Sequence, residues 1–177
     1  MTDNDNLSLL YSREEIASKI KLLAQDIKRD YKDKNPILIS ILKGSFIFMA
    51  DLVRELDFPL EVEFVRFSSY GKGKKSSGKI KVLQGVSFDV ENRHVLIVDD
   101  IVDSGLTCKF LKDILIEKKA ASVKVCALSS KPSQHTVPVD IDYSGLIIPD
   151  KFVVGYGLDF NQKFRNLPDI CILEENK

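Results

Sequence analysis

The residues best suited to chemistry lie in one short segment, residues 99–107, where carboxylates precede a turn of small polar residues. Three aspartates stand within five positions, directly after an apolar run: Asp99, Asp100 and Asp103. The turn from Ser104 to Thr107 leads into residues with helical spacing, so backbone N–H groups and two hydroxyls gather at a helix N-terminus, which suits a phosphate. Carboxylates accept hydrogen bonds from sugar hydroxyls. The segment therefore predicts a site for a ribose 5-phosphate.

Other interpretations of this segment are weaker. A P-loop is excluded because Gly-Lys-Ser/Thr is absent, and a dinucleotide-binding turn is excluded because Gly-x-Gly-x-x-Gly is absent. Aspartates at a strand end can have no role beyond solvating that end. This is common for a single aspartate, but not for three aspartates next to Ser-Gly-x-Thr. Gly105 has no Cβ, so the backbone can approach a ligand closely there.

An α/β sheet is expected to position the segment. Apolar residues at helical spacing predict helices, the first preceded by a capping box at residues 12–15: 13–30, 44 to about 56, and 107–119. Short apolar runs predict strands: 37–42, 62–67, 80–84, 94–98 and 122–128, with shorter pieces at 145–148, 152–154 and 170–173. This alternation predicts a parallel sheet, which binds ligands at the carboxyl ends of its strands.

Residues 68–79 have a composition that cannot pack into a core. They comprise four lysines, four serines and three glycines around one tyrosine. Loops of this length are uncommon in compact domains unless they are functional, so an active-site lid is predicted, with a plain solvated hairpin as the alternative.

The composition limits the class of protein. The chain has 177 residues, of which 44% are hydrophobic and 29% are charged, so a single globular domain over 1–177 is expected. The 26 basic and 26 acidic residues give a net charge of zero, so no nucleic acid partner is expected. Three widely spaced cysteines without a C-x-x-C pair disfavour disulfides and zinc, and no apolar run is long enough to span a membrane. A cytoplasmic location without membrane contact is expected.

The run 95–107 resembles the phosphoribosylpyrophosphate (PRPP) signature of type I phosphoribosyltransferases. It has apolar residues, two acids, two apolar residues and then Asp-Ser-Gly-x-Thr. Residues 148–160 and 164–168 resemble the C-terminal segment of hypoxanthine-guanine phosphoribosyltransferases. The resemblance spans roughly residues 8–173. It implies the type I phosphoribosyltransferase fold, a parallel sheet flanked by helices, with a small hood built from N-terminal residues and roughly 150–177.

The resemblance implies roles at the sugar phosphate. Asp99 and Asp100 would hold the ribose 2′ and 3′ hydroxyls, directly or through a metal, and Asp103 would act on the purine N7 proton as general acid or base. Four consecutive residues would cradle the 5′-phosphate: Ser104, Gly105, Leu106 and Thr107. Two residues of the segment, Asp99 and Leu106, depart from the family's pattern. Many relatives carry glutamate at the first acid, so the contact of the shorter Asp99 is expected to be water-mediated. Some relatives carry lysine in place of Leu106, so backbone N–H groups are expected to matter more.

The resemblance also implies how the purine base is bound. Lys131 would donate to the purine O6, Phe152 would stack on the base, and the Val153 backbone would meet its Watson–Crick edge. The residue pattern alone leaves alternatives open: Lys131 as a solvated lysine at a strand end, and Phe152 as a core residue.

The remaining implied roles concern pyrophosphate and metal. Lys43 and Gly44 fall at the family's pyrophosphate loop, which would contain a cis peptide bond between Leu42 and Lys43. Arg165 would bind pyrophosphate and Asp159 would bind Mg²⁺, with Asp99 and Asp100 as further metal ligands. Two residues fall at the family's lid: Ser69 and Tyr70.

The implied activity is purine salvage, in which PRPP and hypoxanthine or guanine give IMP or GMP and pyrophosphate, in a homodimer or homotetramer. One alternative is an RNA-binding regulator that keeps this fold, although zero net charge does not favour the basic face it would need. A receiver domain is another, suggested by Asp99-Asp100 and Lys131-Pro132, but only about thirty residues separate these pairs. Lys131 disfavours adenine, which has no 6-oxygen; preference among hypoxanthine, guanine and xanthine is left open.

Overall fold

A large, mostly parallel sheet forms the centre of the molecule. The computed structural model describes residues 6–69 and 80–174. Within them, six strands form this sheet: β2 (Ile37–Leu42), β3 (Glu61–Ser69), β4 (Ile80–Gln84), β5 (His94–Val102), β6 (Ser122–Ser130) and β7 (Tyr143–Ile147). The order is β4-β3-β2-β5-β6-β7, and every pair is parallel except β3 with β4. The predicted parallel α/β sheet is confirmed.

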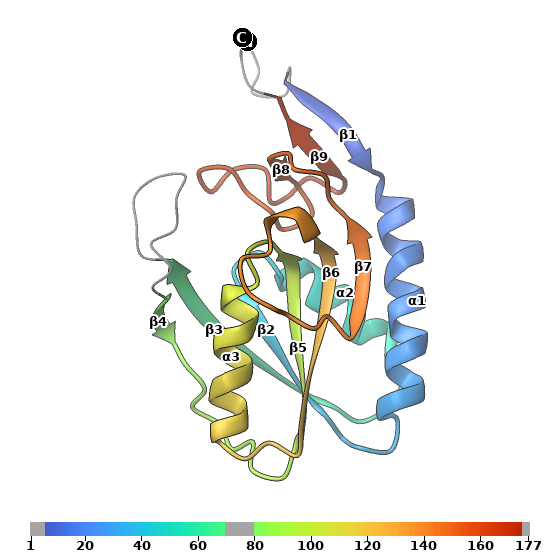
Figure 1. The fold of residues 1–177 in the computed structure, drawn as a ribbon. Coiled ribbons are helices and arrows are strands. Elements are labelled where there is room, and N and C mark those ends of the chain that lie inside the picture. The colour runs from blue at the N-terminus through green and yellow to red at the C-terminus, as the bar shows by residue number, and fades with distance from the viewer. Residues whose placement is uncertain (1–5, 70–79, 175–177) are drawn as a thin grey trace.

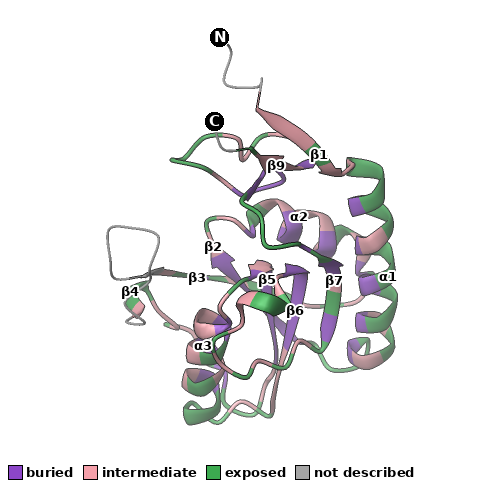
Figure 2. Ribbon diagram, turned by 45° about the horizontal axis from the view of Figure 1, so that its top comes forward, coloured by how far each residue is buried: buried purple, intermediate pink, exposed green. Residues whose placement is uncertain are grey.

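Helices cover both faces of this sheet (Figure 1). Leu38 and Leu96 pack with α1 (Arg13–Tyr31) and α2 (Phe46–Glu55), whereas their strand neighbours Ile37 and Ile97 pack with α3 (Leu106–Glu117). Because side chains alternate along a strand and both faces are covered, most positions of β2 and the 95–98 part of β5 are apolar. Figure 2 shows the buried residues concentrated in these central strands and on the inward sides of the helices. None of the helices in 6–69 and 80–174 is long and apolar enough to span a membrane.

The start of α1 follows the capping box predicted from the sequence. The Ser12 hydroxyl accepts a hydrogen bond from the Glu15 N–H at 3.3 Å, and the Glu15 carboxylate accepts one from the Ser12 N–H at 2.8 Å. These bonds satisfy two N–H groups that the first helical turn would leave unpaired. The predicted helix over 13–30 is confirmed, with its end at Tyr31.

Both ends of the described chain meet in a second, smaller sheet. It has the order β1-β9-β8, from β1 (Leu7–Tyr11), β9 (Ile170–Leu173) and β8 (Val153–Val154). Figure 1 shows it beyond the end to which β5, β6 and β7 point. The Tyr11 hydroxyl donates to the Ile147 carbonyl at 2.8 Å, and the Tyr156 hydroxyl donates to Asp51 of α2. The first contact ties the small sheet to β7, and the second ties the segment between β8 and β9 to α2.

Two expectations need adjustment. Strand β5 does not end at residue 98 but continues to Val102, because its backbone stays paired with β6 as far as Ser130. Asp99 and Asp100 are therefore strand residues and do not follow the strand. Of the predicted lid over 68–79, Ser68 and Ser69 are the last residues of β3, and residues 70–79, with Tyr70, lie outside the described part of the chain.

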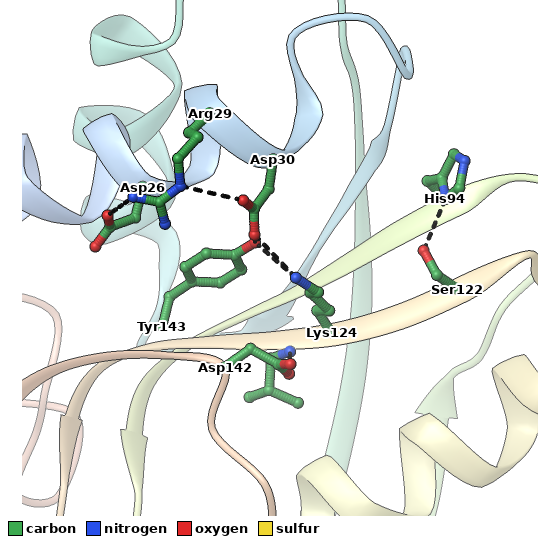
Figure 3. Close-up of polar contacts among 9 residues, drawn as sticks. Asp26, Arg29, Asp30, His94, Ser122, Lys124, Asp142 and Tyr143 are labelled. Atoms are coloured by element: carbon green, nitrogen blue, oxygen red, sulfur yellow. Dashed lines mark hydrogen bonds and ion pairs between the residues drawn. The ribbon is translucent and has the colours of Figure 1, made fainter.

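A polar cluster joins the last turn of α1 to the sheet (Figure 3). The Asp30 carboxylate accepts hydrogen bonds from the Tyr143 hydroxyl at 2.6 Å and from the Lys124 ammonium at 2.9 Å. The Tyr143 bond, followed by the Lys124 bond, lowers the pKa of Asp30 to about 2. The cluster links the end of α1 to β6 and β7.

Candidate active site

The two adjacent carboxylates of β5 are buried and face different elements. Asp99 is 7% exposed and accepts a hydrogen bond from the Cys108 thiol of α3 at 3.3 Å. Asp100 is 8% exposed and lies against Gly44, so closely that a Cβ on Gly44 would fall 1.7 Å from its Oδ2. Burial, followed by the neighbouring Asp100 carboxylate, raises the pKa of Asp99 well above its ordinary value. Burial also raises the pKa of Asp100, although the charge of Arg165 acts in the opposite direction.

The turn after β5 presents backbone N–H groups at the start of α3. Gly105 is the N-cap residue of α3, has a φ of 80°, and brings no side chain that could bind those N–H groups itself. A Cβ on Gly105 would lie 2.8 Å from Val139 Cγ1, so glycine is required by both backbone conformation and space. The Ser104 carbonyl accepts a hydrogen bond from the Thr136 N–H at 3.0 Å, which fixes the turn. This arrangement suits a bound phosphate.

The loop between β2 and α2 lies beside the acid pair. The peptide bond between Leu42 and Lys43 is cis, as the resemblance implied. The buried Ser45 hydroxyl donates to the Ile41 carbonyl at 2.5 Å and anchors the end of the loop. On its other side, Gly157 is so close that a Cβ there would lie 2.0 Å from the Gly44 carbonyl oxygen. Gly44 thus lies between β5 and the segment that follows β8.

That segment carries the remaining charged groups. Arg165 forms an ion pair with Asp159, with Nη2 2.5 Å from Oδ1, and its Nη1 donates to the Gly157 carbonyl at 2.6 Å. Gln162 donates its backbone N–H to Asp159 Oδ2 at 2.8 Å and accepts a hydrogen bond from the Lys43 ammonium at 2.9 Å. Among the described residues, no group of three or more His, Cys, Asp or Glu side chains could by itself hold a metal ion.

The residues expected to meet a base lie at the ends of two strands. Lys131 directly follows β6, and its N–H donates to the Val102 carbonyl at 2.9 Å. Phe152 is 51% exposed, so its interpretation as a core residue is wrong. Its ring packs edge-on against Phe160, with centroids 5.6 Å apart and planes at 83°. Val153 is buried and pairs with Ile172 of β9.

The fold thus brings most of the expected site residues to one edge. Asp103 is exposed directly after β5, just before the turn that leads into α3. The β2–α2 loop, the β5–α3 turn and the 155–165 segment converge beside the acid pair.

Comparison with known proteins identifies the family of this chain. Residues 7–161 match the phosphoribosyl transferase domain family. The chain belongs to this family. A hypoxanthine-guanine phosphoribosyltransferase from Streptococcus pneumoniae strain R6 is 47% identical over 175 residues, which cover 99% of this chain and 97% of the relative.

Solved structures of this phosphoribosyltransferase family share the fold. A hypoxanthine-guanine phosphoribosyltransferase from Bacillus anthracis superimposes with a TM-score of 0.88 and 41% identity, covering 93% of this chain and 97% of that one. A hypoxanthine phosphoribosyltransferase from Staphylococcus aureus gives a TM-score of 0.91 and 36% identity, covering 96% and 93%. The type I phosphoribosyltransferase resemblance is confirmed. These relatives give no support to an RNA-binding regulator or a receiver domain.

Three residues of this phosphoribosyltransferase site were missed from the sequence. Cys108 entered the sequence analysis only as one of three widely spaced cysteines, yet its thiol contacts Asp99. Gly157 and Gln162 were not singled out, although the Gly157 backbone packs on the Gly44 carbonyl and Gln162 bonds to Lys43. The pair of glycines flanking Tyr156 was a signal for a close backbone approach; Gln162 gave none.

Proposed function

We propose that this phosphoribosyltransferase acts in purine salvage, transferring the 5-phosphoribosyl group of PRPP to hypoxanthine or guanine to give IMP or GMP and pyrophosphate. The proposal is supported by the activities that name its relatives. The observation that carries it is the segment 99–107, in which a buried carboxylate pair leads into a helix N-terminus at Gly105, with the Ser104 hydroxyl 3.4 Å from the Leu106 nitrogen. Sugar hydroxyls suit the carboxylates, and a 5′-phosphate suits the turn.

The reaction replaces one bond at the anomeric carbon. The purine N9 forms a bond to C1′ as the bond from C1′ to a pyrophosphate oxygen breaks, and positive charge develops on the ribose ring. Asp99 and Asp100 would hold the ring through its hydroxyls, while Ser104, Gly105, Leu106 and Thr107 hold the 5′-phosphate. Fixing both ends of the sugar aligns C1′ with the incoming base, which removes much of the entropic cost of the reaction. Asp103, exposed beside the turn, would take up the N7 proton.

The leaving pyrophosphate needs cationic and N–H partners. Lys43, Gly44 and Arg165 would supply them, since Gly44 lies against Asp100 and the charge of Arg165 acts on the same carboxyl group. Mg²⁺ prefers one or two carboxylates and otherwise takes phosphate oxygens and water, so Asp159 suits it without a larger cluster of side chains. When bound, Mg²⁺ would neutralise charge on the pyrophosphate.

Base selection would depend on three residues, one directly after β6, one directly before β8 and one at the start of β8. The Lys131 ammonium would donate to the 6-oxygen, the exposed Phe152 would stack on the ring, and the Val153 backbone would meet the Watson–Crick edge. An amino group at position 6 cannot accept from Lys131, so adenine should be a poor substrate.

The proposal also covers the domain, its hood and lid, the assembly and the location of the protein. We expect one domain over 1–177, with a hood built from N-terminal residues and roughly 150–177. Residues 68–79, with Ser69 and Tyr70, would form a lid that excludes water, and the assembly would be a homodimer or homotetramer. A cytoplasmic location is favoured by the three free cysteines.

A PRPP-dependent assay with adenine, hypoxanthine, guanine and xanthine, with and without Mg²⁺, tests the function. Nucleotide formation from hypoxanthine or guanine only when Mg²⁺ is present is the expected result. Transfer to none of the four bases would refute it. Filter binding to RNA with a salt titration tests the alternative, because binding through phosphates weakens steeply as salt rises.

A further inference from the structure

The Lys43 side chain is held by a residue far away in the sequence. Lys43 itself is exposed, yet its ammonium donates to Gln162 Oε1 at 2.9 Å across 119 positions of the chain. A lysine side chain has many rotamers in water, so a fixed acceptor on another segment restricts it strongly. This bond joins the β2–α2 loop directly to the segment after β8.

The orientation of Gln162 is itself fixed by Asp159. Asp159 Oδ2 accepts the Gln162 backbone N–H at 2.8 Å and lies 3.4 Å from Nε2. A carboxylate can only accept and an ammonium can only donate. The amide group therefore satisfies both neighbours in one orientation, with its N–H groups toward Asp159 and its carbonyl toward Lys43.

These contacts form part of a closed ring. The other Asp159 oxygen pairs with Arg165, and Arg165 and Gly157 exchange two hydrogen bonds, at 2.6 Å and 3.0 Å. Gly157 packs on the carbonyl of Gly44, which adjoins Lys43. Within this ring, Gln162 is the uncharged side chain that forms hydrogen bonds with charged ones, Lys43 and Asp159. Because a glutamine is neutral, it fixes the Lys43 ammonium without cancelling its charge, so that charge remains available to a polyphosphate.

We propose that Gln162 is a positioning residue for the pyrophosphate subsite: it acts through Lys43 to hold the Lys43–Gly44 segment and the lysine charge where the pyrophosphate of PRPP binds. The inference rests on the proposed function, because it deepens the role given there to this loop. Gln162 does not touch the reacting atoms, so its loss should weaken pyrophosphate binding more than it slows the chemical step.

The test uses the whole chain and two substitutions. Gln162→Ala removes the bond to Lys43. Gln162→Asn keeps an amide that tolerates the positive φ of 68° at this position but is one methylene too short to reach Lys43. Both variants should raise the KM for PRPP and the Kd of Mg²⁺-pyrophosphate, measured by calorimetry, by about tenfold, as expected for one hydrogen bond to a charged group, with kcat changed less than about twofold. Gln25→Ala, at an exposed glutamine of α1, is the matched control and should change none of these.

A double-mutant cycle decides whether Gln162 acts through Lys43. Gln162→Ala should have no further effect on pyrophosphate binding in a Lys43→Met background. Equal effects of Gln162→Ala with and without Lys43 would overturn the inference, as would unchanged pyrophosphate binding in the single variants. If the parent chain transfers no ribosyl group to any base, the proposed function has failed. If the parent is active and the variants bind pyrophosphate as it does, the inference alone has failed.

Discussion

Replacing Gly44 by alanine should disable the enzyme by displacing Asp100. A Cβ at residue 44 would lie 1.7 Å from Asp100 Oδ2 and 2.6 Å from its Cγ. Asp100 cannot easily give way, because it is buried in β5 and its carbonyl accepts a hydrogen bond from the Ser129 hydroxyl at 2.8 Å. Gly44 cannot easily retreat either, because Gly157 packs on its carbonyl.

The size of the effect follows from these distances. Ordinary contacts begin near 3.4 Å, so the new methyl group and the Asp100 carboxylate must separate by about 1.7 Å, the difference between 3.4 and 1.7 Å. A misplacement of about 1 Å in a positioning group can cost about 100-fold in rate, or about 2.7 kcal/mol of transition-state stabilisation. We therefore expect kcat/KM for PRPP to fall at least about 100-fold. Crowding should also lower the free energy of unfolding by about 1–3 kcal/mol.

Steady-state kinetics with varied PRPP, together with urea unfolding, measure the two effects. Gly85→Ala is the matched control, because a Cβ there would meet only the Val82 methyl group, at 3.2 Å, on an exposed side chain. Its kinetics and stability should match those of the parent. Near-parental kcat/KM in Gly44→Ala would refute the argument, because Asp100 would then not need its observed position. A folded variant with lost activity would support it.

Three further predictions concern chemistry, base binding and acid stability. Asp103→Asn should lower kcat by about 100-fold or more, as for loss of a general acid or base, and full turnover in this variant would remove Asp103 from proton transfer. Phe160→Leu should raise the KM for the base about fivefold at constant kcat, because the edge-on contact at 5.6 Å orients Phe152; an unchanged KM would contradict this role. Asp30→Asn should destabilise the fold by about 1 kcal/mol at pH 7, a figure reduced for the partial exposure of this carboxylate. Because the pKa of Asp30 is lowered to about 2, the difference in urea unfolding should be present above about pH 4 and disappear toward pH 2; a difference that does not change with pH would contradict the assignment.

The sequence predicted the elements whose side chains repeat with a clear period. Helix α1 has both an apolar stripe and a capping box, and its predicted bounds differ from the observed ones by one residue. The extent of β5 was predicted less well, because its last residues are kept in the sheet by backbone pairing with β6 and not by apolar side chains. A carboxylate at a strand end gives no local sign of whether the strand continues through it.

Contacts between distant segments could not be predicted in the same way. The segment 155–165 has no repeating pattern, and several of its residues have positive φ, among them Tyr156, Asn161 and Gln162. Its course depends on how β8 and β9 pair and on where Gly157 meets the β2–α2 loop. The bond from Gln162 to Lys43 follows from that packing alone.

The position of the acid pair explains why its two members should not be equivalent. Adjacent strand residues project to opposite faces of a sheet. Asp99 accordingly meets Cys108 on the face covered by α3, whereas Asp100 lies against Gly44 on the other. The Cys108 thiol occupies one acceptor site of Asp99 Oδ2, so a sugar hydroxyl or a bridging water would share this carboxylate with the thiol. Asp100 lies beside the β2–α2 loop, and the charge of Arg165 acts on it.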